Sequence, residues 1–295
     1  MDTNDFSMSA KLARIEKRGA EAAKTEEQKI QEKPQQLWLP GFDFGAFPNH
    51  LNRSSLIAPI ARGRRKFHRQ TEMVTRKDCV LEYTGEQLDE ADGDLIMTLI
   101  AFAQPHKLGT AVLLNRKELL RKIKRDSIGS TQYQWLYRSM KRLREATMFL
   151  EARKSDGTTR YTVGKMTSFN ILADLEYGSE GSESETYAFT LDPRWVMLFS
   201  NKEFSLIDWD KRMQIARGQD MAKTLQRLIA TSDNLVQHYA IEWLKSKMEY
   251  TSPMRKFREA LTASCLELKR LDIISSGKIE RSTKGIEQLT LVICG

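Results

Sequence analysis

The sequence is poor in the residues that form disulfides, metal sites and catalytic groups. Its 295 residues include only three cysteines and four histidines, and none of them has the spacing of metal ligands. Cys79, Cys265 and Cys294 are odd in number and far apart, so we predict no disulfide, no metal site and no cofactor. The sequence also lacks a glycine-rich phosphate loop and a nucleophile elbow, which argues against an enzyme.

Long apolar segments are absent as well. No run of eighteen apolar residues occurs, and the N-terminal segment has no apolar signal-peptide core. Residues 1–34 instead contain seven basic and seven acidic side chains, and such a segment cannot bury a core by itself. The sequence therefore predicts a soluble, cytoplasmic protein with a charged N-terminal arm and no membrane partner.

What the chain does contain is a local excess of positive charge. Residues 116–144 hold ten Lys or Arg residues against two acids, a net charge of +8, which equals the net charge of the whole chain. The positive and negative charges of the remaining residues therefore cancel one another. A block this local indicates either a polyanionic partner or a solvated helix face.

The charged block has the pattern of a helix-turn-helix. Helical patterns at 115–124 and 130–146 are separated by a short turn, and Ser130 is a candidate N-cap. The second helix repeats residues at spacings of three and four that we expect to face the core. They are Tyr133, Leu136, Tyr137, Met140, Leu143 and Thr147. The opposite face carries side chains suited to base edges and phosphates, and we predict that it binds DNA. It comprises Thr131, Gln134, Trp135, Arg138 and Arg142.

A hairpin pattern follows the second helix. Strand-like runs at 148–152 and 161–164 flank an Asp-Gly turn signal. Helix, turn, helix and hairpin is the order of a winged helix, so we assign wing contacts with DNA to Arg153, Lys154 and Arg160. The alternative is an ordinary amphipathic helix pair, because charge runs are usually soluble surface.

A second pattern of this kind lies near the C-terminus. A short helix at 238–248 precedes Pro253, a favoured first-turn residue, and a longer helix that extends to 271. Strands at 273–276 and 286–294 would form its wing. We expect an inward stripe of Phe257, Leu261, Ser264, Leu268 and Leu271. We assign DNA contacts to Arg255, Arg258, Thr262 and Lys284. The charge is weaker here, which leaves a three-helix dimerisation or packing module as the alternative.

Length and pattern together predict an α+β fold with two tandem winged-helix domains. A chain with 40% hydrophobic residues can bury two cores of this size. We expect a charged arm and linker at 1–47, a first winged-helix domain at 48–192 and a second at 193–295.

Other patterns fill in these two domains. The first would contain a strand pair at 66–75 and 80–87, and a helix at 92–102 with acids at its start. The acidic Gly-Ser-Glu segment at 178–185 predicts a loop between strands. The second domain would open with a helix at 210–231, interrupted near Gly218.

A basic cluster stands where the chain enters the first domain. We predict that Arg64 and Arg65 add backbone or minor-groove contacts with DNA, as an arm does. The alternative is a solubilising face of an edge strand.

Five short segments occur in a fixed order along the chain. They read PNHLNRSSL at 48–56, LEYTGEQLD at 81–89, DLIMTL at 94–99, LDPR at 191–194 and FSLIDW at 204–209. In this order they resemble the TrfA family of broad-host-range plasmid replication initiators, over roughly residues 37–295. The resemblance implies tandem winged-helix domains that bind repeated sites (iterons) in the plasmid origin as double-stranded DNA. It implies opening of an AT-rich segment, which makes single-stranded AT-rich DNA a further candidate partner, and recruitment of the host initiator and helicase. It also implies control of plasmid copy number through a balance of monomer and dimer.

One further segment separates an initiator from a plain repressor. The sequence QLWLP at 36–40 resembles the Gln-Leu-x-Leu-Phe peptide by which bacterial proteins bind the polymerase sliding clamp. Gln36, Leu37 and Leu39 match this peptide, Pro40 replaces its terminal Phe, and Phe42 follows two residues later. The alternative is that this apolar segment packs the linker onto the first domain.

These patterns predict a non-enzymatic plasmid replication initiator. Two recognition helices on one chain can enter successive major grooves about 10 bp apart, so a binding site of roughly 20 bp is expected. The second hypothesis is a winged-helix transcriptional repressor, which binds promoter DNA and leaves an origin duplex closed. A DNA-nicking enzyme is a third class, and the absence of a close histidine pair for metal disfavours it.

Overall fold

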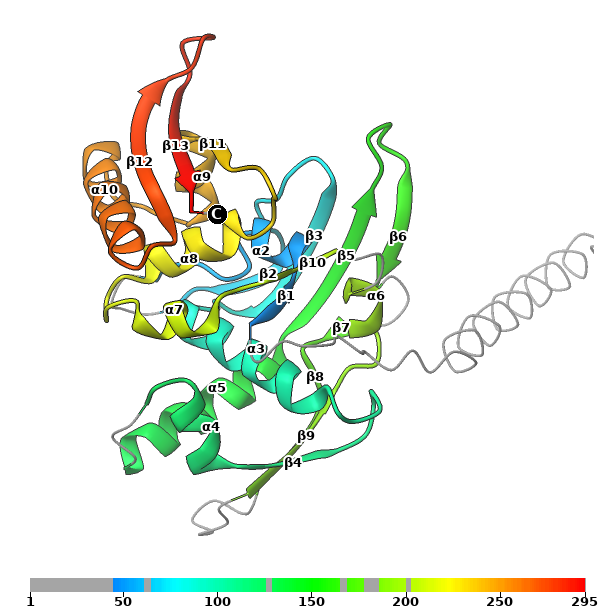
Figure 1. The fold of residues 1–295 in the computed structure, drawn as a ribbon. Helices are drawn as coiled ribbons and strands as arrows, with labels where there is room; N and C mark the ends of the chain where they lie inside the picture. The colour runs from blue at the N-terminus through cyan, green and yellow to red at the C-terminus, as the bar shows by residue number, and fades with distance from the viewer. Residues whose placement is uncertain are drawn as a thin grey trace, which may run out of the picture. The chain divides into compact units, whose positions relative to one another are not determined.

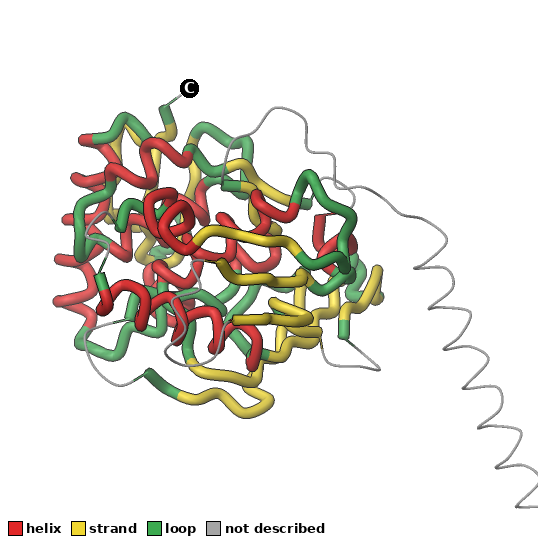
Figure 2. Tube along the Cα trace, turned by 90° about the horizontal axis from the view of Figure 1, so that it is seen from below, coloured by secondary structure: helices red, strands yellow, loops and turns green. Residues whose placement is uncertain are grey.

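The computed structural model describes residues 45–60, 65–125, 129–164, 169–177, 186–199 and 203–294. In these ranges the chain combines helices with antiparallel sheets (Figure 1). Viewed from below, most helices gather on one side and most strands on the other (Figure 2). None of the described helices has the length and hydropathy needed to cross a membrane. Arg64 and the predicted clamp peptide at 36–42 lie outside the described residues.

Buried apolar side chains form two separate clusters. The first extends over residues 46–207 and the second over residues 215–291. Trp195 and Leu198 belong to the first cluster, although the predicted boundary at 192 assigns them to the second domain. The division between the two cores therefore falls within residues 208–214.

Fifteen elements surround the first core in the described residues. They are β1 (Ala46–Pro48), α2 (Asn49–Arg53), β2 (Phe67–Glu72), β3 (Cys79–Glu86), α3 (Glu90–Ala103), β4 (Val112–Asn115), α4 (Arg116–Lys122), α5 (Ser130–Glu145), β5 (Thr147–Arg153), β6 (Thr159–Val163), β7 (Phe169–Asn170), β8 (Leu172–Tyr177), β9 (Thr186–Leu191), α6 (Trp195–Phe199) and β10 (Phe204–Leu206). They form a sheet in the order β2-β3-β5-β6 with β7 beside β5, a sheet in the order β4-β9-β8, and the pair β1-β10. The predicted strand pair and the acid-initiated helix are both confirmed, as β2, β3 and α3.

Within residues 203–294, seven elements surround the second core. They are α7 (Trp209–Gln214), α8 (Asp220–Ile229), β11 (Val236–Ala240), α9 (Ile241–Lys247), α10 (Met254–Arg270), β12 (Ile274–Arg281) and β13 (Glu287–Ile293). The three strands pair in the order β11-β13-β12. The predicted inward stripe of α10 is confirmed, since all five of its residues are buried.

Two local expectations are wrong. Residues 238–240 belong to strand β11 rather than to a helix, because burial alternates there and the buried Gln237 side chain donates to the carbonyl oxygens of Ile229, Ser232 and Asn234. Ser130 is the first helical residue of α5 rather than its N-cap. The cap position is Gly129, whose extended backbone precedes the helix.

The described chain contains the same order of elements twice. The first helix-strand unit is α3, β4, α4, α5, β8 and β9, and the second is α8, β11, α9, α10, β12 and β13. In both units the first strand pairs with the third, and the third pairs with the second. The first unit differs by the insertion of β5, β6 and β7 between α5 and β8.

This topology corrects the position of the first hairpin. The strands predicted at 148–152 and 161–164 exist as β5 and β6, but β5 pairs with β3, in a sheet that excludes β4, β8 and β9. Every second side chain of β5 is buried in the first core, namely Met148, Leu150 and Ala152. Leu150 lies opposite Leu81 of β3. Figure 1 shows the β5–β6 hairpin extending away from α4 and α5. The hairpin equivalent to β12–β13 is therefore β8–β9.

Candidate nucleic-acid interface

Helix α5 has a buried face and an exposed face, and each holds part of the set that its sequence predicts. Leu136, Met140 and Leu143 are completely buried against the first core. Thr131, Gln134 and Arg138 are exposed on the other side, at successive spacings of three and four. Lys141 continues this exposed row and pairs with Glu145 at 3.8 Å. Lys141 was missed by the sequence analysis, although its spacing of three from Arg138 would have identified it.

Trp135 has internal contacts that the exposed members of the predicted recognition face lack, and its contact with DNA stays a prediction. Its ring is half-buried, packs against the first core and is covered by the guanidinium of Arg125, 3.5 Å from the ring centroid. Arg125 Nη1 also donates a hydrogen bond to Gln132 Oε1 at 2.9 Å. These contacts close the turn between α4 and α5, so the indole supports the turn rather than the exposed row.

Arg142 is also held by internal partners, and its contact with DNA stays a prediction. Its Nε donates to Glu86 Oε2 and its Nη1 to Asp92 Oδ1, both at 2.8 Å. The side chain is only 9% exposed. A guanidinium held by two carboxylates at such depth joins α5 to β3 and α3. Withdrawing it to reach DNA would leave the buried Asp92 without this partner, which is costly.

Arg65 has a similar structural role. Its Nη1 donates to Asp92 Oδ2 at 2.8 Å and to the carbonyl oxygen of Gln87 at 2.6 Å, and its Nη2 pairs with Asp89. Asp89 and Asp92 also form the capping box that begins α3. These contacts hold Arg65 inside the protein, and its predicted backbone or minor-groove contact with DNA stays a prediction.

The start of α3 also contacts the second core. Glu90 is fully buried and accepts hydrogen bonds from Arg212 at 2.8 Å, Arg227 at 2.5 Å and Thr224 at 2.6 Å. Burial alone would raise the pKa of Glu90, but Arg227 and Arg212 bring it down to about 2. Asp94, one turn later, pairs with Arg212 at 2.5 Å. This buried ion network joins α3 to α7 and α8.

The cations of the β5–β6 hairpin divide into paired and exposed residues. Arg153 pairs with Glu151 at 2.8 Å, and Arg160 pairs with Glu203. Lys154 is exposed beside the turn. Because this hairpin belongs to another sheet, none of the three lies on the hairpin of the first helix-strand unit.

The second helix-strand unit presents a more exposed set. The side chain of Arg255 is 79% exposed and pairs with Glu259 at 2.9 Å, within one turn of α10. Arg258 makes two hydrogen bonds of 2.8 Å to Glu287 on β13 and is only partly exposed. Thr262 and Lys284 are exposed, on α10 and in the β12–β13 turn.

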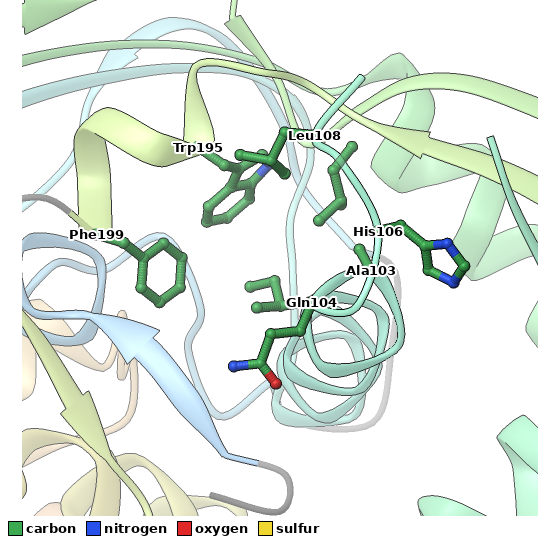
Figure 3. Close-up of a pocket in the computed structure, with 8 residues that line it drawn as sticks. Ala103, Gln104, His106, Leu108, Trp195 and Phe199 are labelled. Atoms are coloured by element: carbon green, nitrogen blue, oxygen red, sulfur yellow. The ribbon is translucent and has the colours of Figure 1, made fainter. Parts of the chain in front are cut away.

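A separate pocket lies at the end of α3 and has different chemistry (Figure 3). Trp195 and Phe199 of α6 face Ala103 and Leu108 across it, while the ring of His106 points away. No charged side chain lines this pocket, so it does not suit a phosphate. Nowhere in the described ranges do three or more His, Cys, Asp or Glu side chains gather as a metal site would require.

Comparison with known proteins identifies the family. The TrfA protein family matches residues 10–282, which is most of the chain. This chain belongs to the TrfA family of plasmid replication initiators. As a TrfA-family member, it is a DNA-binding replication initiator, and origin DNA is its partner. A search of curated protein sequences found no match.

Solved structures share the fold of this TrfA-family chain. A selenomethionine derivative of domains 2 and 3 of RctB is similar, with a TM-score of 0.56 and 13% identity, over 81% of this chain and 95% of that one. A second structure of RctB domains 2 and 3 has a TM-score of 0.52 and 14% identity, over 80% of this chain and 95% of that one. At these identities the likeness concerns the fold alone.

Proposed function

We propose that this protein initiates plasmid replication by binding iterons as duplex DNA through two tandem winged-helix domains, which divide within residues 208–214. The carrying observation is the repeated order of elements with the same strand order, β4-β9-β8 and β11-β13-β12. In each unit a short helix, a longer helix and a hairpin follow one another. In winged-helix and helix-turn-helix proteins the second helix enters the major groove, so α5 and α10 are the proposed recognition helices.

The exposed row of α5 carries the proposed base readout. Arg138 is suited to the acceptor pair of guanine, and Gln134 to adenine. Arg255 and Thr262 on α10, with Lys284 on the β12–β13 turn, would contact the neighbouring groove and its phosphates. Two helices in successive grooves predict a site of roughly 20 bp. Arg142, Arg65 and Trp135 are not part of this proposal, because their contacts are internal.

Origin opening and recruitment of host proteins complete the proposal. The protein would act without catalysis, by stabilising an opened AT-rich segment and binding host replication proteins. A monomer–dimer balance would control how much of it is available for iterons. The family membership supports these steps, and the peptide at 36–42 supports contact with the sliding clamp.

Permanganate footprinting on a supercoiled origin plasmid tests this function. Reactive thymines beside the bound repeats are expected for an initiator. Protection of the repeats without reactive thymines would instead indicate a transcriptional repressor. Nicking of the same plasmid in the presence of magnesium or manganese would contradict the non-enzymatic part of the proposal.

A pull-down with the host sliding clamp tests the recruiting peptide. Replacing Leu37 and Leu39 by Ala should abolish capture by the clamp and leave duplex affinity unchanged. Equal capture of the variant would mean that the apolar segment serves only to pack the linker.

A further inference from the structure

A polar cleft lies beside the first turn of α5, and one of its loops contacts α10. It is lined by α3, the turn after α4, the first turn of α5 and the loop between α7 and α8. On one side, Trp209 at the start of α7 donates a hydrogen bond to the carbonyl oxygen of Lys122, at the end of α4. On the other side, the amide of Ala216 donates to Glu267 Oε1 of α10 at 2.6 Å. These two hydrogen bonds link the walls of the cleft to α4 and to α10. Figure 1 shows α10, the α7–α8 loop and the end of α4 along the same side of the molecule.

The charge of the cleft suits an anion. Four cations line it, against the two acids Asp94 and Asp220. They are Lys124, Arg125, Arg217 and Lys223. Lys223 is engaged by Asp94 at 2.5 Å, and Arg125 is held by Gln132 and Trp135. Lys124 and Arg217 are exposed, and neither forms an ion pair within the described ranges.

Arg217 also lies near a like charge. Burial lowers the pKa of Arg125, and the positive charge of Arg217 lowers it further, against the opposing effect of Asp89, Asp94 and Asp92. A phosphate close to Arg217 would give this cation an opposite charge, which no ion pair supplies within the described ranges.

The backbone conformation of Lys124 closes α4 and allows a substitution that separates its side chain from the fold. Lys124 has a φ of 51°, in the left-handed region. The amide of Arg125 donates to the carbonyl oxygen of Leu120 at 2.8 Å, which closes α4 in the manner that usually selects glycine at this position. The equivalent left-handed residue after α9 is Glu249, and its carboxylate accepts a hydrogen bond from Gln87 at 2.6 Å. Glu249 therefore has a structural partner, whereas the side chain of Lys124 faces the open cleft.

We propose that Lys124 and Arg217 bind the DNA backbone phosphates that separate the two major grooves entered by α5 and α10. This inference rests on the proposed function and adds a contact that neither recognition helix supplies. A duplex that received both helices would pass its backbone across the cleft, where the two exposed cations would neutralise it. The bound backbone would also fix the spacing between the two halves of the site.

Two substitutions separate this role from folding. Lys124→Gly should keep or raise the Tm, because glycine adopts the left-handed conformation without strain, and should still weaken binding to the origin duplex. The double variant Lys124→Gly with Arg217→Gln should reduce the slope of log Kd against log salt by about two, one for each phosphate that is no longer neutralised. Lys107→Gln, an exposed lysine in the loop after α3, is the matched control and should leave the slope unchanged.

Phosphate-ethylation interference on the origin duplex locates the contact. For the wild type, ethylation between the two halves of the site should block binding. For the double variant this central interference should disappear, while interference at the flanking phosphates persists. An unchanged central pattern and salt slope in the double variant would overturn the inference and leave the proposed function intact. Failure of the wild type to form any specific complex would overturn both.

Discussion

The two helix-strand units share an order of elements and differ in the surfaces that they present. Aligning the buried Leu136, Met140 and Leu143 with Leu261, Cys265 and Leu268 brings the two longer helices into register. The exposed positions of α5 then hold Thr131, Gln134, Arg138 and Lys141, and those of α10 hold Lys256, Glu259, Ala263 and Leu266. The same backbone position thus carries donors in one unit and mixed or apolar groups in the other.

The charge of the two hairpins differs in the opposite sense, since the hairpin of the second unit is the more basic one. Residues 170–187, which include β8, hold five acids and no base. Strands β12 and β13 and their turn carry three bases, Lys278, Arg281 and Lys284, against two acids, Glu280 and Glu287. Under the proposed function, the acidic hairpin would repel DNA phosphates, and the weakly basic hairpin would attract them. We expect the first unit to contribute specificity and the second to contribute phosphate affinity.

The largest effect is expected from a substitution in the buried ion network that joins α3 to α7 and α8. Glu90→Gln leaves the buried guanidinium of Arg227 without a carboxylate and leaves that of Arg212 with Asp94 alone, so the free energy of unfolding should fall by about 3–5 kcal/mol. Urea denaturation of the full chain measures this change. Glu259→Gln, which removes only an exposed pair, should change it little.

The same variant should change the response to acid. Because the pKa of Glu90 is about 2 in the folded chain, below its ordinary value of 4.5, its ionised form stabilises the fold fully above pH 4.5. This contribution is lost as the pH falls from 4.5 towards 2. A Glu90→Gln chain with the same acid-induced loss of stability would contradict the assignment.

The next prediction compares two arginines of α5, one expected to affect stability and the other DNA binding. Arg142→Ala should lower the free energy of unfolding by about 3 kcal/mol, because it leaves Asp92 with one partner fewer in a buried site. Arg138→Ala should leave the Tm unchanged and weaken binding to the origin duplex by about 1–3 kcal/mol. Thermal unfolding and gel-shift titration distinguish them. Equal losses of affinity with unchanged Tm for both would show that Arg142 also reaches the DNA.

A smaller effect tests the two hairpins. Replacing Lys278, Arg281 and Lys284 by Gln should weaken duplex binding and flatten its salt dependence, by about one in the slope for each phosphate that the hairpin no longer neutralises. Replacing Arg153 and Lys154 by Gln, on the hairpin outside both units, should leave the slope unchanged. A flatter slope for this second variant would restore the β5–β6 hairpin to the interface.

The last comparison concerns two lysines at equivalent positions. Lys122 is exposed at the end of α4, whereas Lys247 of α9 is completely buried and donates to the carbonyl oxygen of Ser54 at 2.7 Å. Burial lowers the pKa of Lys247 well below 10.5, so the unfolded chain binds the extra proton and stability should rise as the pH rises towards 10.5. Lys247→Met should flatten this rise by up to about 1.4 kcal/mol per pH unit.

Local pattern alone predicted most of the regular elements. The stripes of α5 and α10 follow from apolar residues repeating at three and four, and the strands β5, β6 and β13 follow from alternation and turn signals. The exposed residues Thr131, Gln134 and Arg138 were found in the same way. These features depend on residues close in sequence, so the sequence contains the information directly.

Only the tertiary structure decided which strands pair and which cations are held by internal partners. Strand β5 could have paired with its unit's own sheet, and its partnership with β3 depends on a buried surface that no local spacing records. Arg142 and Arg138 look alike in the sequence, but the carboxylates that hold Arg142 lie 56 and 50 residues away. Arg212 meets Glu90 across 122 residues. Charge content was therefore a property of the sequence, while the availability of each charge was set by partners that only folding brings close.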